Sequence, residues 1–175
     1  MPNDDTGFAE VYDAHIEKIY AFVYYRVSHR EIAEDLTSAT FLKALDKYAT
    51  FKGGNVRAWL YRIARNTITD HYRTHHPPVD LETAQDVPST SNPAQDAETR
   101  MQLGRVREEL DKLPAEQRDI VLLRVWDGLT HAEIAEILGK SEASVKMQFS
   151  RSLRQLQSKL PLAVLILLLT LRHHA

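Results

Sequence analysis

The stretch from residue 130 to residue 156 constrains the fold most, because its pattern predicts two helices joined by a tight turn. Thr130 stands three residues before Glu133, the spacing of a capping box at a helix start. Gly139 suits the turn, since glycine adopts a positive φ without steric cost. Ser141 is placed to cap the second helix. The pattern is that of a helix-turn-helix.

Both predicted helices are amphipathic. The expected inner positions are Ile134, Ala135 and Leu138 in the first helix, and Val145, Phe149, Leu153 and Leu156 in the second. The opposite face of the second helix carries Ala143, Lys146, Met147, Ser150, Arg151 and Arg154. Glu142 is the one acid from Lys140 to Lys159. A solvated helical hairpin is the alternative, but it more commonly alternates its charges. We therefore predict that this face binds DNA, with base edges and phosphates as its partners.

Composition and charge narrow the class of protein. The chain has 175 residues and no cysteine, which excludes disulfides and thiolate metal sites. Its first residues lack the basic and apolar segments of a signal peptide, so a cytoplasmic location is expected. The net charge is only −2, but it is unevenly spread. Acids dominate residues 1–51 and 77–100, whereas bases dominate 52–76 and the last predicted helix. Two basic surfaces on an otherwise acidic chain suggest two contacts with DNA.

The remainder of the chain also predicts helices and no strand. Apolar spacing indicates helices over about 8–27, 28–48 and 56–73, the second opened by a capping box of Ser28 and Glu31. We expect Ile32, Leu36, Leu42 and Leu45 along the apolar stripe of the second helix. In the third helix we expect Trp59 in the core, and Tyr61 and Tyr72 at the surface.

The predicted fold class is all-α, with two small helical domains joined by a flexible acidic linker and a helix-turn-helix in the second. The boundaries are residues 1–76 for the first domain, 77–100 for the linker and 101–160 for the second domain. An apolar tail, 161–175, follows, and it is shorter than the ~20 residues that span a bilayer. We expect the tail to pack within the chain or against a partner.

No enzyme active site is predicted, because the chain has no nucleophile–base pair and no phosphate-binding glycine loop. His71 and His75 have the i, i+4 spacing that zinc ligands use, with His76 beside them. No cysteine or suitably spaced carboxylate completes such a site, so we predict no metal and no cofactor. These histidines are expected to extend the basic surface.

Three runs of sequence resemble the extracytoplasmic-function (ECF) group of bacterial RNA polymerase sigma factors. Residues 33–41 (AEDLTSATF) are similar to that family's core-polymerase-binding motif. Residues 51–53 (FKG) with 57–66 (RAWLYRIARN) resemble its promoter-melting and minus-10 segment. Residues 113–118 (LPAEQR) with 129–156 resemble its minus-35 domain. The likeness covers about residues 8–160 in the family's order.

This resemblance implies roles for individual residues. Core polymerase would be bound by Asp35, Leu36, Ser38, Phe41 and Leu42, although Leu36 and Phe41 are equally good core residues. Minus-10 DNA would be bound by Asn55, Arg57, Arg62, Arg65 and Asn66. Minus-35 DNA would be bound by Lys146, Met147, Gln148, Ser150, Arg151 and Arg154. Gln148, where the family often has arginine, is expected to reach a phosphate from the flank.

The resulting prediction is a sigma factor that binds core RNA polymerase, recognises two promoter elements and helps to open the duplex. By resemblance we also expect an anti-sigma factor as a partner and no small-molecule substrate. The alternative is a stand-alone helix-turn-helix regulator that binds duplex DNA as a dimer. A membrane-tethered adaptor is a weaker alternative. Two features argue against the stand-alone regulator. The segment around Trp59 has no obvious use in a duplex-binding regulator, and the sequence shows no dimerisation helix with sustained heptads.

Overall fold

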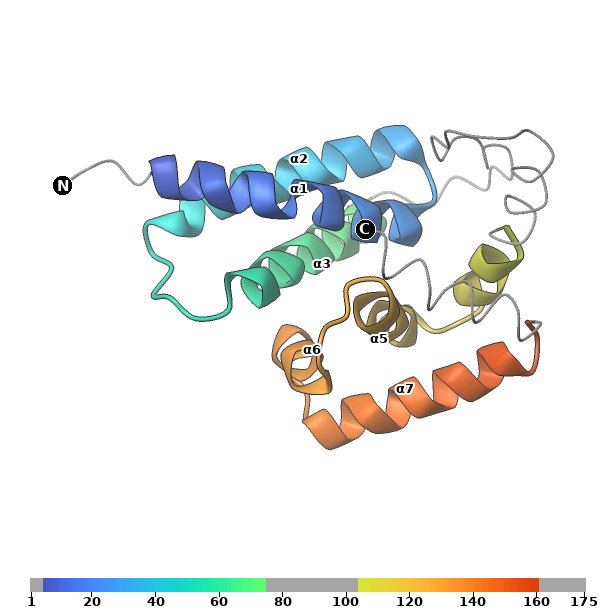
Figure 1. Ribbon diagram of the computed structural model, residues 1–175. Helices are drawn as coiled ribbons and strands as arrows, with labels where there is room; N and C mark the ends of the chain where they lie inside the picture. Colours follow the sequence, from blue (N-terminus) through green and yellow to red (C-terminus); the bar gives the residue numbers. More distant parts are fainter. Residues whose placement is uncertain (1–4, 75–103, 161–175) are drawn as a thin grey trace, which may run out of the picture. The chain divides into compact units, whose positions relative to one another are not determined.

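The computed structural model describes residues 5–74 and 104–160, and every regular element in these ranges is a helix (Figure 1). The predicted linker at 77–100, the tail at 161–175, and His75 and His76 lie outside the described residues. The described parts separate into two compact units. Two helical domains are therefore present, and each is considered by itself.

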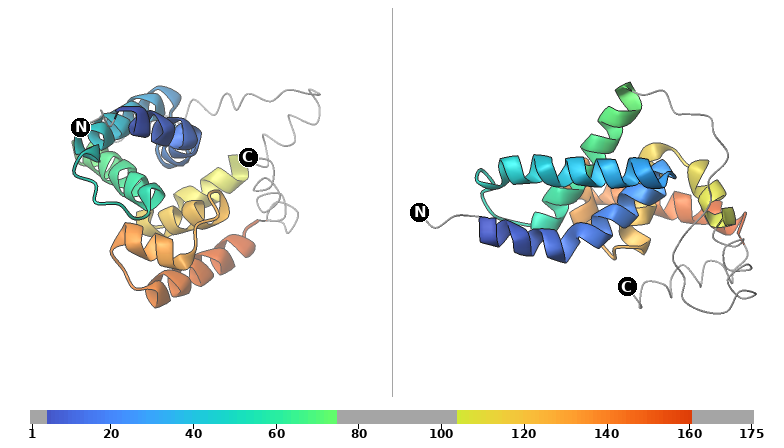
Figure 2. Two further views of the ribbon diagram at one scale, coloured as in Figure 1. Left: turned by 60° about the vertical axis from the view of Figure 1, so that its left-hand side comes forward. Right: turned by 90° about the horizontal axis from the view of Figure 1, so that it is seen from above.

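The N-terminal domain is a bundle of α1 (Asp5–Val27), α2 (Arg30–Tyr48) and α3 (Val56–Thr74), and each helix packs against the other two (Figure 2). Its core is built from apolar side chains at helical spacing, among them Phe8, Ile19, Phe22, Val23, Ala33, Ala44, Leu60, Ala64 and Ile68. The rings of Phe22 and Tyr61 meet edge to face, with centroids 5.4 Å apart. This contact joins α1 to α3.

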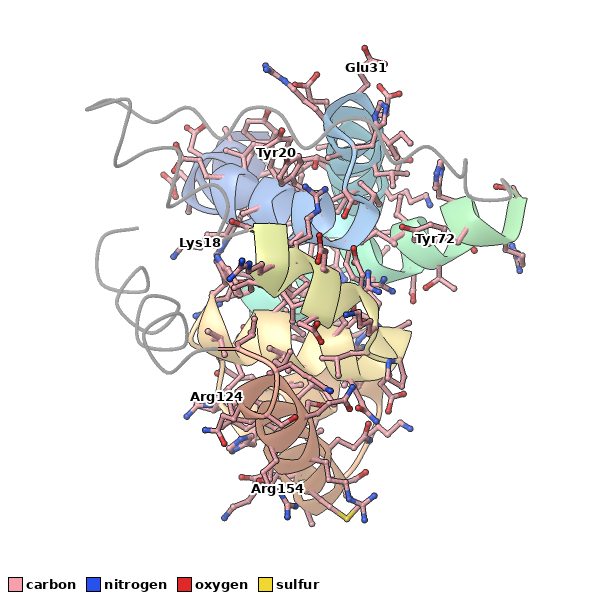
Figure 3. All side chains as sticks on the ribbon, turned by 90° about the vertical axis from the view of Figure 1, so that its right-hand side faces the viewer. Lys18, Tyr20, Glu31, Tyr72, Arg124 and Arg154 are labelled. Atoms are coloured by element: carbon pink, nitrogen blue, oxygen red, sulfur yellow. The ribbon has the colours of Figure 1, made fainter. Side chains whose placement is uncertain are left out.

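Tyr61 is 1% exposed, so the prediction that it lies at the surface is wrong. Its position on the α1-facing side of α3 is set by packing between helices, which the local pattern does not reveal. Tyr72 lies on the same helix and is half-buried, with its hydroxyl donating to the backbone oxygen of Arg26 at 3.0 Å (Figure 3).

The capping box predicted at Ser28 and Glu31 is also wrong. Ser28 adopts a positive φ of 61° and its N–H donates to Tyr24 O at 2.9 Å, so it closes α1. The N-cap of α2 is His29, with extended backbone and no side-chain capping bond. Only Ser28 and His29 connect the two helices. Because Ser28 adopts the left-handed conformation that ends α1, it does not have the extended backbone of an N-cap for α2.

The apolar stripe predicted for α2 is correct at Leu36, which is buried, but wrong at its end. Leu42 and Leu45 are 64% and 44% exposed, whereas the neighbouring Phe41 is 4% exposed. The buried side of α2 is instead completed by small residues such as Ala33, Thr37 and Thr40. Thr37 and Thr40 satisfy their hydroxyls on the carbonyls of Ala33 and Leu36 one turn earlier.

The C-terminal domain consists of helical residues 104–111 followed by α5 (Ala115–Val125), α6 (His131–Leu138) and α7 (Glu142–Gln157). Its core contains Val106, Leu110, Leu113, Ile120, Leu122, Leu123, Leu129, Ile134, Ile137, Val145, Leu156 and Leu160. Phe149 and Leu153 are half-buried. The inner face of α7 also includes a polar residue, Ser152, with no exposed surface.

Both ends of α6 follow the predicted local chemistry. Glu133 N–H donates to Thr130 Oγ1 at 3.2 Å, and Thr130 N–H donates to Glu133 Oε2 at 2.7 Å, which completes the capping box. Gly139 has a φ of 65° and ends the helix. Ser141 then caps α7, its Oγ accepting from Ser144 N–H at 3.3 Å. The helix-turn-helix is therefore confirmed in detail.

Candidate nucleic-acid and polymerase interfaces

One face of α7 gathers most of the residues predicted to bind minus-35 DNA. Five of the six are exposed, at steps of one, three or four residues along the helix: Lys146, Met147, Ser150, Arg151 and Arg154. Arg154 projects from the outer side of α7 (Figure 3). The face offers cations for phosphates, a hydroxyl for base edges and a polarisable thioether.

Gln148, the sixth predicted residue, is half-buried and hydrogen-bonded within the domain. Its Nε2 donates to Glu116 Oε1 on α5 at 3.0 Å and to Ser144 Oγ at 3.3 Å. Glu116 also lies 3.0 Å from Lys140 Nζ, just before α7 begins. Sequence reasoning missed Glu116, because its partners stand 24 and 32 residues away. No local spacing indicates such a contact.

His131, the first residue of α6, packs on α7. Its ring lies 5.6 Å from that of Phe149, measured between centroids. Burial, assisted by the nearby charges of Arg124 and Lys146, lowers the pKa of His131 below its ordinary value of 6.5. The imidazole is therefore neutral at pH 7 and adds no charge to the α7 surface.

In the N-terminal domain, the loop between α2 and α3 is anchored at both ends. The rings of Phe51 and Trp59 lie 4.8 Å apart between centroids, which ties the start of the loop to α3. At its end, Asn55 Oδ1 accepts from Ala58 N–H at 3.0 Å and caps α3. Gly53 and Gly54 between these anchors are exposed, with φ of 85° and 106°. The loop thus presents backbone that only glycine adopts without strain.

The structure divides the predicted minus-10 residues of α3 among different faces. Arg62 and Asn66, one turn apart, are both exposed on the outer side of the helix. Arg65 is half-buried on the flank. Arg57 is half-buried too, and its charge acts on His15 of α1, whose pKa is lowered by burial, by Lys18 and by Arg57. Arg57 therefore lies on the α1 side of α3, apart from the outer pair.

The residues predicted to bind core polymerase also divide. Asp35, Ser38 and Leu42 are exposed on α2 at steps of three and four residues, and Leu45 continues this row. Leu36 and Phe41 belong to the core, where the Phe41 ring lies 4.8 Å from that of Tyr12 between centroids. A row with one carboxylate, one hydroxyl and two leucines is suited to bind another protein.

A hollow of about 280 Å³ lies beside this row, between α1 and α2. Its lining comprises Ile16, Glu17, Tyr20, Glu34, Thr37 and Ser38. Burial and the charge of Glu34 raise the pKa of Tyr20, so its hydroxyl stays protonated. The sequence pattern does not predict a role for α1 at this hollow, although Ile16 and Tyr20 share a face at i, i+4.

Comparison with known proteins gives both domains a family. Residues 11–76 match the model for sigma-70 region 2, and residues 103–156 match that for sigma-70, region 4. SigX, an ECF RNA polymerase sigma factor of Bacillus subtilis, is 30% identical over 166 residues, covering 89% of this chain and 84% of SigX. The chain belongs to the ECF sigma factors. The family resemblance stated from the sequence is thus confirmed.

Other relatives support this assignment. The sigma factor YlaC of Bacillus subtilis is 30% identical over 156 residues, covering 86% of this chain and 90% of YlaC. The ECF sigma factor BldN of Streptomyces coelicolor is 33% identical over 160 residues, and the chain spans 61% of its length. The sigma factor RpoE of Bartonella quintana, solved with the anti-sigma factor NepR, superposes with a TM-score of 0.72 at 26% identity. That match covers 89% of this chain and 96% of RpoE.

This sigma factor is a non-enzymatic initiation factor that directs RNA polymerase to promoters. The family decides against the stand-alone regulator, because region 2 is a sigma-factor domain that a simple duplex-binding regulator does not contain. Among the residues that the structure describes, no helix is both long and apolar enough to cross a membrane. No group of three or more potential metal ligands occurs in the same part of the chain.

Proposed function

We propose that the two domains recognise the two promoter elements separately, the C-terminal domain the minus-35 element and the N-terminal domain the minus-10 element. The observation that carries the proposal is the exposed face of α7, where five predicted DNA-binding residues lie together. At the N-terminus of a recognition helix, Lys146, Met147 and Ser150 are in the segment that normally meets base edges. Arg151 and Arg154 follow one turn further on, where phosphates are the expected partners.

For the minus-10 element, the proposed binding surface consists of the glycine loop, Asn55 and the outer face of α3. Arg62 and Asn66 would contact the DNA backbone, and the exposed loop would receive an unstacked base. Strand separation would be favoured because the protein binds the separated strand and not the duplex. Arg57 and Arg65 would support this surface from its flanks.

Docking on core polymerase is proposed for the exposed row on α2, formed by Asp35, Ser38, Leu42 and Leu45. Exposed apolar side chains with polar groups beside them fit the apolar centre and polar rim of a protein interface. An anti-sigma factor is a further expected partner, since the similar RpoE of Bartonella quintana was solved in complex with NepR. Work alongside RNA polymerase implies the cytoplasmic location predicted from the sequence.

The test is transcription in vitro with core polymerase from the source bacterium, using DNA from upstream of this protein's own gene. A discrete transcript that requires the protein is the expected result. Replacing the minus-35 or the minus-10 sequence of that template should each reduce the transcript. A transcript that is insensitive to both replacements would contradict two-element recognition. The Arg30→Ala variant removes an exposed cation of α2 that belongs to neither proposed DNA-binding surface, and it serves as the control.

A further inference from the structure

The first turn of α5 is tied to the recognition helix by polar side chains. Glu116 Oε1 accepts a hydrogen bond from Gln148 Nε2 at 3.0 Å and lies 3.0 Å from Lys140 Nζ. One turn further along α7, Ser152 Oγ donates to Gln117 Oε1 at 3.1 Å. Two consecutive residues of α5 therefore contact the middle of α7, and Glu116 also contacts Lys140 just before that helix begins.

These bonds occupy the donors that Gln148 would need for a phosphate. The side-chain amide has two N–H donors and one acceptor oxygen. Two acceptors lie within reach of Nε2, namely Glu116 Oε1 and Ser144 Oγ at 3.3 Å. The remaining amide oxygen is an acceptor and cannot bind a phosphate, which also only accepts. The structure thus gives Gln148 a different role from the one the sequence predicts.

Directional bonds of this kind add to apolar packing in fixing the rotation of a helix. Val145 and Leu156 bury the inner face of α7, but Phe149 and Leu153, next to Gln148 and Ser152 in the chain, are only half-buried. A hydrogen bond weakens steeply when its angle changes. A rotation of α7 about its axis would break the Glu116–Gln148 bond and would move the neighbouring Met147 and Arg151 away from their places on the outer face.

We propose that Glu116 and Gln148 are positioning residues for minus-35 recognition. Glu116 holds α7 in the rotation at which its exposed side chains meet the base edges, and Gln148 is the group through which it acts. Lys140 is held at the same carboxylate and steadies the start of the helix. This inference rests on the proposed minus-35 function of the C-terminal domain.

The test is a double-mutant cycle with the full-length protein in complex with core polymerase. The variants are Glu116→Ala, Gln148→Met and the two combined. The quantity measured is discrimination between two templates. It is the amount of transcript from the promoter upstream of this protein's own gene, divided by the amount from the same promoter with its minus-35 sequence replaced. Each single change should lower this ratio by about tenfold, the equivalent of one hydrogen bond to a charged group, and the double variant should lose no more than either single one.

A phosphate-binding Gln148 gives the opposite pattern and would refute the proposal. Gln148→Met would then weaken transcription from both templates equally, leave the ratio unchanged, and act equally in the Glu116→Ala background. If wild-type protein does not discriminate between the templates, the proposed minus-35 function fails and this inference fails with it. If wild type discriminates but the cycle is additive, only the positioning role fails.

Two further variants separate positioning from stability and from charge. Glu109→Ala removes a carboxylate that binds Lys112 at 2.6 Å in the same domain, away from α7, and should leave the ratio unchanged. Glu116→Gln keeps an acceptor oxygen for Gln148 and should retain most of the discrimination. A loss as large as that of Glu116→Ala would assign the effect to charge and overturn the proposal. All ratios are measured at a temperature where thermal unfolding shows each variant to be folded.

Discussion

Asn55 caps α3: its Oδ1 accepts a hydrogen bond from Ala58 N–H at 3.0 Å. The residue expected to bind an unstacked base thus also starts the helix that carries Arg62 and Asn66. A simple alanine substitution would remove both functions at once, so it cannot distinguish between them.

We predict that Asn55→Ser and Asn55→Ala separate the cap from the DNA contact. Serine caps about as well as asparagine, so Asn55→Ser should keep its melting temperature, whereas Asn55→Ala should lose about 1 kcal/mol of stability. Both variants lack the amide, and transcription should therefore fall by about tenfold in each. Thermal unfolding and transcription in vitro measure the two effects. Full activity of Asn55→Ser would show that this amide does not contact DNA.

The neighbours Phe41 and Leu42 should behave in opposite ways when they are changed. Phe41 is 4% exposed, so Phe41→Ala should lower the free energy of unfolding by about 3 to 5 kcal/mol. Leu42 is 64% exposed, so Leu42→Asp should leave stability nearly unchanged but weaken binding to core polymerase by about tenfold or more. Urea unfolding and a polymerase-binding titration measure these effects. Normal polymerase binding by Leu42→Asp would remove this residue from the docking surface.

Arg151→Ala should weaken promoter binding without lowering the melting temperature. The side chain is exposed on α7, and its loss from a phosphate contact should reduce the salt dependence of binding by about one unit of slope. Binding of the holoenzyme to promoter DNA at several salt concentrations measures the slope. A drop in melting temperature would show that Arg151 has a structural role. An unchanged slope with unchanged affinity would show that Arg151 does not contact DNA.

Thr130→Ala should lower the stability of the C-terminal domain by about 1 kcal/mol, because it removes the oxygen that accepts from Glu133 N–H. Thr130→Ser keeps that oxygen and is the matched control. The two capping-box residues should be coupled, so that Glu133→Ala costs less in the Thr130→Ala background than in wild type. Additive losses would show that the reciprocal bonds do not act as a unit.

The C-terminal domain should lose stability as the pH falls through the range in which His131 takes up a proton. Its pKa is lowered in the folded chain, so the unfolded chain binds the proton more tightly. Stability should therefore decline below pH 6.5 and level off below the folded pKa. Urea unfolding followed by Trp126 fluorescence in a Trp59→Phe background reports this domain alone. His131→Gln should make the profile flatter, and an unaltered profile would mean that another group is responsible.

Features that depend on residues close together in the chain can be predicted from the sequence alone. Thr130 and Glu133, Gly139, and Ser141 lie within one or two turns of the groups they serve, so their spacing predicts the helix-turn-helix and its caps. The exposed face of α7 follows in the same way, because the period of a helix places Lys146, Ser150 and Arg151 on one side. The run around Trp59 likewise carried the family assignment.

Local patterns failed where a connection is short or where several helices compete for one side chain. Ser28 and Glu31 have the spacing of a capping box for α2, but Ser28 instead ends α1 through its N–H bond to Tyr24 O. Tyr61 is predicted at the surface from the local pattern, but in the folded domain Phe22 of α1 packs on its ring and buries it. Leu42 has the hydrophobicity of a core residue, yet it lies on the exposed side of α2, whereas the adjacent Phe41 lies on the buried side.

Which functional groups lie together depends on packing between distant segments, and it becomes visible in the folded chain. The sequence alone assigned Gln148 to a phosphate, whereas α5 brings Glu116 to it across 32 residues. Arg57 and Arg62 belong to one basic run, but Arg57 is half-buried and its charge acts on His15 of α1, whereas Arg62 is exposed on the outer face. Spacing along a helix fixes which side chains share a face. The choice of the face that is covered, and of the partner that covers it, depends on contacts between residues far apart in the sequence.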